Sequence, residues 1–349
     1  MLPRGGAEGI GPVSEPRRGA LSRWAILGAM RCVTTDYHTA GEPFRIVTEG
    51  VPEIPGATVR ERRTFAQGSE EVDAVRRLLC HEPRGHADMY GCFLVPGDDD
   101  GADLGVLFWH KDGYSTACGH GTIALGAWAV QSGRVPGPPG GDGEVDVTID
   151  VPSGRVVARV TVRGGQVDGV AFRNVPAFVL ARGVRAGDVE VDVAYGGAIY
   201  AFVPAERFGL RVRGEDLPAL IAAGRAVKAA IDGTDVVRHP GDDRLSGLYG
   251  TVLYESVGDG AERNVTIFAD GEVDRSPCGS ATSARTALLA PGVTAWTNHS
   301  ISGGTFAARA LGETPDGLLT EVAGTAFRTG EHVFTLDPRD PLGTGFVLR

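Results

Sequence analysis

The chain has 349 residues, of which 42% are hydrophobic and 22% are charged, and its formal net charge is −10. This composition is typical of a globular enzyme with a sizeable core, built as two domains or one large one. The negative charge argues against a nucleic-acid partner and against a polybasic membrane surface. We therefore expect no nucleic acid and no membrane as partners, whereas the charge says nothing specific about a small-molecule substrate.

The first 29 residues are rich in Gly, Pro and Arg. Their apolar patch, WAILGAM, is too short for a membrane span and follows too many helix breakers to be a good signal peptide. We expect residues 1–29 to form a disordered N-terminal extension, and an upstream start codon is one explanation for it.

From Arg31 onward the patterns predict, in chain order, helices over 71–79 and 122–130, strands over 145–151, 156–162 and 189–193, a helix over 217–231, a strand over 264–268 and a helix over 280–289. The first two strands alternate apolar and polar residues around Pro152-Ser153-Gly154-Arg155, which predicts a β-hairpin. The mixture predicts an α+β fold with largely antiparallel sheets, each wrapping a helix.

Two segments resemble one another. Residues 117–130 read ACGHGTIALGAWAV and residues 277–290 read PCGSATSARTALLA, so that each copy places Cys-Gly before an Ala/Leu-rich helical run. Cys118 and Cys278 are 160 residues apart, close to half the folded length. Duplicated halves of this kind would face each other across a cleft, with one cysteine from each half.

A thiol at a helix start has a specific chemistry. The first N–H groups of a helix lack internal partners and carry about half a positive charge, so we expect the pKa of the thiol to fall toward neutrality. The same N–H groups can seat a carboxylate. Two such units offer a thiol on each face of a bound amino acid, together with donors worth about 3 kcal/mol each to a developing enediolate. That arrangement suits inversion of an α-carbon without a cofactor.

The other cysteines, Cys32, Cys80 and Cys92, are predicted to be buried structural residues. The odd total and the wide spacing do not indicate a disulfide framework, and no spacing indicates a zinc site, so we predict no metal. Free thiols suggest a reducing compartment and hence a cytoplasmic protein. From the residues alone, Cys118 and Cys278 remain open between a structural and a catalytic role.

Five segments together resemble the proline racemase family, which includes 4-hydroxyproline 2-epimerases and trans-3-hydroxy-L-proline dehydratases. In order they are DYHTAGEP (36–43), EPRGHADMYG (82–91), YSTACGHGTI (114–123), YGGAIYA (195–201) and DRSPCGSATSAR (274–285). The resemblance runs from about Arg31 to the C-terminus. The related diaminopimelate epimerases usually carry Asn where His120 stands in this chain, so they are the weaker match.

The resemblance implies roles for matching positions. Cys118 and Cys278 would be the catalytic thiols. The side chains of His120 and Asp274 would contact the ring nitrogen of the substrate, and its carboxylate would be bound by the backbone N–H groups of Gly119, His120, Gly279 and Ser280. Asp274 could instead cap a turn or pair with Arg275, and His120 could be a hydrogen-bonding scaffold. We assign structural roles to four further polar residues of the matched segments, His38, Glu42, His86 and Asp88.

The resemblance also implies two pseudo-symmetric halves of the diaminopimelate epimerase type, with the active site between them. We place the first half at 31–178 plus 330–349 and the second at 179–329. Members of the family are often dimers, so a homodimer is the assembly to test.

The leading functional prediction is a cofactor-independent racemase or epimerase that acts on 4-hydroxyproline or proline. The alternative is a trans-3-hydroxy-L-proline dehydratase, and a third reading from another class is a non-catalytic imino-acid-binding protein. Dehydratases of the family commonly replace one thiol by Ser or Thr, whereas this chain keeps both. Ala281 stands where many racemases have Gly, which leaves the choice of substrate open.

Overall fold

The computed structural model describes residues 30–258 and 260–348. The extension expected over residues 1–29 lies outside the described residues. The first part of the chain forms β1 (Arg31–Thr39), β2 (Glu42–Glu49), α2 (Val59–Gly68), α3 (Glu70–Cys80), β3 (Tyr90–Val95), β4 (Leu104–His110), β5 (Gly113–Tyr114), α4 (Gly119–Gln131), β6 (Gly143–Val151), β7 (Gly154–Arg163) and β8 (Gln166–Arg173).

The second part forms β9 (Phe178–Ala186), β10 (Val189–Tyr195), β11 (Ile199–Pro204), α5 (Leu217–Ile231), β12 (Leu248–Gly258), β13 (Ala261–Phe268), β14 (Glu272–Asp274), α6 (Gly279–Leu289), β15 (Ala295–Ser300), β16 (Thr305–Thr314), β17 (Gly317–Gly324) and β18 (Ala326–Thr335). Short 3-10 helices are η1 (Ala205–Phe208), η2 (Gly214–Asp216), η3 (Asp235–Val237) and η4 (Asp243–Leu245).

The two halves repeat one strand order. In the first half the strands are hydrogen-bonded in the order β18-β1-β2-β3-β4-β6-β7-β8. Neighbouring strands are antiparallel except in the pairs β2–β3 and β4–β6, which are parallel. The neighbours β9-β10-β11-β12-β13-β15-β16-β17 follow the same series of orientations. Each half also has its central helix at the corresponding place, α4 after β5 and α6 after β14. The predicted α+β fold with two pseudo-symmetric halves is confirmed.

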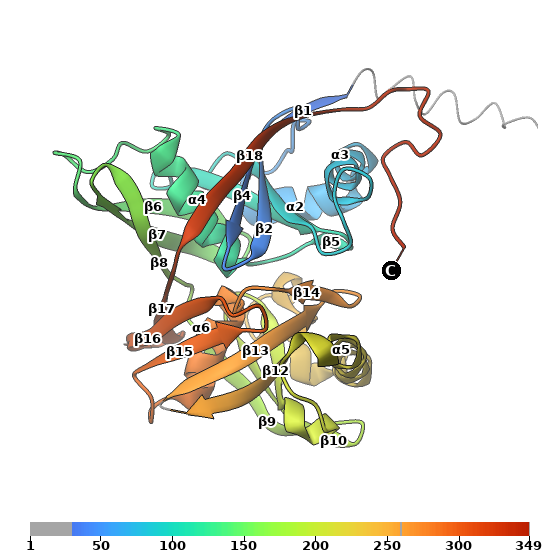
Figure 1. Cartoon of the computed structure of the whole chain (residues 1–349), viewed down its shortest axis with the longest axis vertical. Helices are drawn as coiled ribbons and strands as arrows, with labels where there is room; N and C mark the ends of the chain where they lie inside the picture. Colours follow the sequence, from blue (N-terminus) through green and yellow to red (C-terminus); the bar gives the residue numbers. More distant parts are fainter. Residues whose placement is uncertain (1–29, 259, 349) are drawn as a thin grey trace, which may run out of the picture.

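Each sheet wraps its central helix (Figure 1). Residues Gly119 to Ala129 of α4 are all buried, and α6 is buried from Gly279 to Leu288 except at Arg285. Small and apolar residues on every side suit a helix that is surrounded by a sheet. At Gly126 an added Cβ would lie 2.8 Å from the Ala158 methyl group of β7, so glycine lets that strand approach the helix.

Most predicted elements are found, and one helix was missed. The predicted helix over 217–231 coincides with α5, and the predicted hairpin is the antiparallel pair β6 and β7. The missed helix is α2, whose sequence VRERRTFAQG has more charged residues than apolar ones. Its local signal is a cap, because the Thr58 side chain accepts a hydrogen bond from the Glu61 N–H.

The chain crosses between the halves more than once. β8 and β17 pair antiparallel and join the two sheets, and β18 then returns to pair with β1 (Figure 1). The residue limits that we assigned to the halves stay a prediction. Within the described residues, no helix combines the length and the apolar character needed to cross a membrane.

Candidate active site

The first candidate thiol lies at the start of α4. Cys118 is the N-cap residue, and its Sγ accepts a hydrogen bond from the Gly121 backbone N–H at 3.2 Å. Both ring nitrogens of His120 lie 3.5 Å from the same sulfur. Only 5% of Cys118 is exposed. The helix start therefore holds a buried thiol with one N–H group directed at its sulfur.

The second candidate thiol lies at the start of α6 in a different backbone conformation. Cys278 has φ 58° and ψ 96°, a region that residues other than glycine rarely adopt. Its Sγ lies 3.8 Å from the Tyr200 hydroxyl and 4.0 Å from Ser280 Oγ, and these two oxygens are 2.6 Å apart. The two thiols thus occupy matching positions in the repeat but have different polar neighbours.

The two helix starts meet at their glycines. A Cβ added to Gly119 would lie 2.5 Å from the Gly279 Cα and 2.7 Å from the Ser280 N, and one added to Gly279 would lie 2.8 Å from the Gly119 Cα. The first N–H groups of each helix, those of Gly119 and His120 and of Gly279 and Ser280, have no acceptor within their own helix. Four backbone N–H donors, two from each half, therefore lie close together at the contact between the two helix starts.

Replacement of Gly119 by Ala is expected to keep the halves from closing, because the new methyl group would overlap backbone atoms that cannot rotate away. We expect a loss of about 1–3 kcal/mol in the free energy of unfolding, which urea titration measures. Gly68→Ala is the matched control, because an added Cβ there has nothing within 4 Å. Equal stability of the two variants would contradict the close contact.

The electrostatics of the thiols differ from the sequence-based expectation. Burial raises the pKa of Cys118 well above its ordinary value, the Gly121 N–H offsets this only in part, and the charges of Asp274 and Cys278 raise it further. Burial likewise raises the pKa of Cys278, and Asp274 adds to the rise. The expected fall of the thiol pKa values toward neutrality is therefore wrong for this closed site. Desolvation of the thiolate raises the pKa by more than the N–H groups at the helix start lower it.

His120 and Asp274 face each other from the two halves. The His120 Nδ1 lies 3.8 Å from Asp274 Oδ2. Burial lowers the pKa of His120 to about 4 against the opposing effect of Asp274, so the imidazole is neutral at pH 7. Asp274 Oδ1 also accepts hydrogen bonds from the Ser276 N–H at 2.8 Å and the Ser276 hydroxyl at 2.7 Å. Asp274 thus holds a turn and also faces His120.

Aromatic side chains that the sequence analysis did not include surround His120. The rings of Tyr90 and Phe44 lie 5.0 and 5.7 Å from the His120 ring, both edge-on. The Tyr90 hydroxyl is hydrogen-bonded to Ser115 and lies 2.9 Å from the Tyr249 hydroxyl. Tyr90 and Tyr249 lie at the starts of the equivalent strands β3 and β12. Only the strand order of the repeat, which the sequence did not reveal, brings these two tyrosines together.

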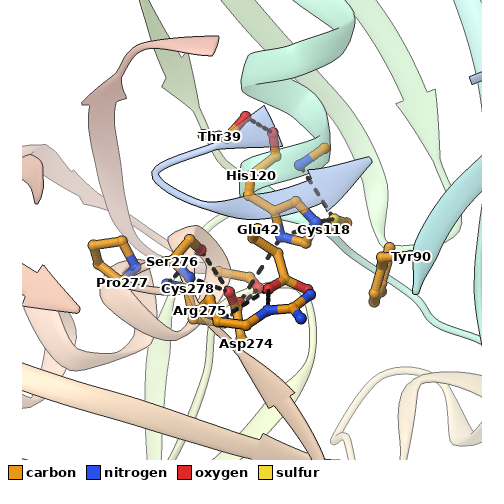
Figure 2. Close-up of polar contacts among 12 residues, drawn as sticks. Thr39, Glu42, Tyr90, Cys118, His120, Asp274, Arg275, Ser276, Pro277 and Cys278 are labelled. Atoms are coloured by element: carbon orange, nitrogen blue, oxygen red, sulfur yellow. Dashed lines mark hydrogen bonds and ion pairs between the residues drawn. The ribbon is translucent and has the colours of Figure 1, made fainter. Parts of the chain in front are cut away.

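The polar residues assigned to the scaffold do make structural contacts. The fully buried Glu42 pairs with Arg275 of the other half at 2.7 Å, so Arg275 has a carboxylate partner other than Asp274 (Figure 2). Asp88 accepts a backbone hydrogen bond from β14 at 3.1 Å. His38 accepts one from the turn that follows β1 at 3.3 Å. The backbone carbonyl of His86 accepts one at 2.9 Å.

One group of described residues has the composition of a metal site. Donor atoms of His110, Asp112 and Glu272 all lie within 4.8 Å of one another. However, the Lys111 ammonium lies 3.0 Å from both Asp112 oxygens and already supplies a positive charge there. The residues therefore fit a structural cluster between the halves better than a cation site, and we assign no ion to it.

The comparisons with known proteins agree with the geometry. The chain matches the family model for proline racemase over residues 34–347. It is 42% identical to a trans-3-hydroxy-L-proline dehydratase of Bacillus cereus, over 90% of this chain and 97% of that protein. It is also 42% identical to the Homo sapiens protein of the same name, over 90% of this chain and 94% of that protein.

Solved structures give a second line of similarity. A hydroxyproline epimerase from Agrobacterium vitis, crystallised with trans-4-hydroxy-L-proline, superposes with a TM-score of 0.84 at 30% identity over 91% of this chain and 96% of that chain. A probable proline racemase from Agrobacterium radiobacter, with bound carbonate, gives a TM-score of 0.85 at 30% identity and the same coverage. With nearly full-length matches in both sequence and structure, the chain belongs to the proline racemase family.

Proposed function

We propose that the protein removes the α-proton of a proline-type amino acid with one thiol of the Cys118–Cys278 pair and, by returning a proton from the other, inverts the α-carbon. The observation that carries this proposal is the contact between Gly119 and Gly279, because it brings two Cys-Gly helix starts from opposite halves to one place. A substrate held there has a thiol on either side.

The carboxylate and the ring nitrogen of the substrate then have separate partners. The N–H groups of Gly119, His120, Gly279 and Ser280 hold the carboxylate and stabilise the enediolate that forms on it, at about 3 kcal/mol for each donor. The Asp274 carboxylate attracts the ring ammonium, and the neutral His120 can hydrogen-bond to it. No step of this scheme calls for a cofactor.

The proton transfers use both sulfurs. One thiolate takes the α-proton, and the opposite thiol donates its proton to the other face of the same carbon, so that the enzyme ends with the roles of the two thiols exchanged. Because the pKa values of both thiols are raised, each sulfur is a strong base once it is ionised. For the same reason the opposite thiol stays protonated until it donates its proton. Which sulfur acts first depends on the enantiomer bound.

Dehydration of trans-3-hydroxy-L-proline is the second candidate, and the names of the relatives support it better than inversion. The dehydratases are 42% identical to this chain, whereas the hydroxyproline epimerase is 30% identical. The first step would be the same proton removal. The thiol that took the α-proton would then give it to the C3 hydroxyl, which leaves as water, and an enamine remains. The retained second thiol favours inversion, because elimination needs no proton from the opposite face.

Incubation in deuterated water separates the candidates. We expect L-proline and trans-4-hydroxy-L-proline to lose the α-proton signal as the opposite configuration appears, and proton spectra record both changes. Conversion of trans-3-hydroxy-L-proline to a cyclic imine, without inversion of the other two, would make the protein a dehydratase. Thermal stabilisation by these compounds with no exchange at all would leave only a binding protein.

The location and assembly remain proposals. All five cysteines are free and buried, which suits a reducing compartment, and we retain the cytoplasm as the expected location. A homodimer stays a prediction that light scattering of the purified protein can test.

A further inference from the structure

The turn between β1 and β2 touches both thiol segments. On one side, the Thr39 hydroxyl donates to the His120 carbonyl in the first turn of α4 at 3.0 Å. On the other side, Glu42 Oε2 accepts from the Arg275 backbone N–H and from Arg275 Nε, both at 2.7 Å. Figure 2 shows both contacts, the first at the start of α4 and the second close to Cys278. Four consecutive residues, 39–42, therefore connect the start of α4 to the loop that precedes α6.

The turn is also fastened to a second loop of the other half. Ser302 Oγ donates to the Arg275 carbonyl at 2.7 Å and lies 3.3 Å from the Ala40 carbonyl. A Cβ added to Gly304 would lie 2.5 Å from the Ala40 Cβ, so the 300–304 loop is packed directly against the turn. The turn is thus held between the loop before α6 and the loop after β15.

Glu42 is a costly residue to place in a turn. It is 0% exposed, and its Oε1 has no hydrogen-bond partner among the described residues. Burial raises the pKa of Glu42 well above its ordinary value, the Asp274 charge adds to the rise, and Arg275 only partly offsets it. A buried carboxylate with an unpaired oxygen weakens the folded state, so folding alone does not account for this residue.

We propose that Thr39 and Glu42 are positioning residues that set the placement of Cys118 relative to Cys278. This inference rests on the proposed two-thiol function. Inversion requires both sulfurs to be aligned through one α-carbon, whereas exchange of the α-proton with solvent requires only one. Loosening of either contact should therefore impair inversion more than exchange.

The test measures both processes in Glu42→Gln and in Thr39→Val, with L-proline or the better substrate in deuterated water. We expect kcat for inversion to fall about 100-fold, the effect of a displacement of about 1 Å at a reacting centre, with little change in KM. Exchange without inversion should become detectable. Because both contacts serve one alignment, the double variant should lose little more than the worse single variant.

Asp242→Asn is the matched control. Asp242 pairs with Arg60 of α2 at 2.7 Å and so also links the two halves, but it does not contact the thiol segments. It should leave the ratio of inversion to exchange unchanged. An equal shift in this control would mean that any loosening between the halves suffices, and the positioning role would be wrong.

The outcomes separate this inference from the proposed function. If the wild-type protein neither inverts nor exchanges, the proposed function fails. If the wild type inverts and both variants keep the wild-type ratio of inversion to exchange, only the positioning role fails. Should Glu42→Gln not fold, Ser302→Ala replaces it. The exposed Ser302 hydroxyl donates to the backbone carbonyl of Arg275, the residue that Glu42 also contacts, and its loss leaves the core intact. If the ratio of inversion to exchange is unchanged in both Ser302→Ala and Thr39→Val, the proposal is overturned.

Discussion

Replacement of Cys278 by Ser, or of Cys118 by Ser, is expected to lower the rate of inversion by about 10²- to 10⁴-fold. A serine hydroxyl is a far weaker acid than a thiol, so it can neither supply a base nor return a proton at useful rates. Optical rotation of L-proline or of a hydroxyproline isomer measures the loss. Full inversion by either variant would contradict the two-thiol mechanism.

The same variants should remain partly active in a way that identifies the role of each sulfur. The remaining thiol still reaches one face of the substrate, so each variant should exchange the α-proton of one enantiomer only. Dehydration of trans-3-hydroxy-L-proline, if the wild type performs it, should survive in just one of the two variants. Cys32→Ser is the control, because that cysteine lies in β1 within a separate apolar cluster, and its sulfur donates to the Gly50 carbonyl at 3.6 Å.

The stability of the protein should depend on pH through His120. Burial lowers its pKa to about 4 in the folded state, from an ordinary value of 6.5. Between these values the unfolded chain binds a proton that the folded chain does not, so stability is fully present above about pH 6.5 and falls as the pH falls. Acidification from about pH 7 to about pH 5 should cost about 2 kcal/mol through this group.

A variant isolates that contribution. His110, whose pKa burial lowers to about 3, acts in the same direction, whereas Glu42 and Glu272, whose pKa values burial raises, act in the opposite one. The difference between the wild type and His120→Asn cancels these shared terms. Urea titrations at the two pH values should show the wild type losing more stability than the variant. Equal losses would mean that His120 is not buried in its neutral form.

The sequence was a good guide to the local elements around the thiols. Small and apolar residues after each Cys-Gly predicted the two central helices, because such runs suit a helix buried on all sides. The repeat of Cys118-Gly119 at Cys278-Gly279 predicted two facing halves, and the strand order bears this out. The helix α2 was missed because charged residues outnumber the apolar ones in its sequence.

Only the tertiary structure decided how deeply the thiols are buried and which distant residues contact each other. The sequence by itself determined that each thiol stands at a helix start, because caps and periodicity are local. It could not determine that both thiols are buried, and burial reverses the expected direction of their pKa shifts. Nor could it pair Glu42 with Arg275, which are 233 residues apart. Desolvation and long-range contacts depend on which surfaces meet, and that is settled only when the two halves close.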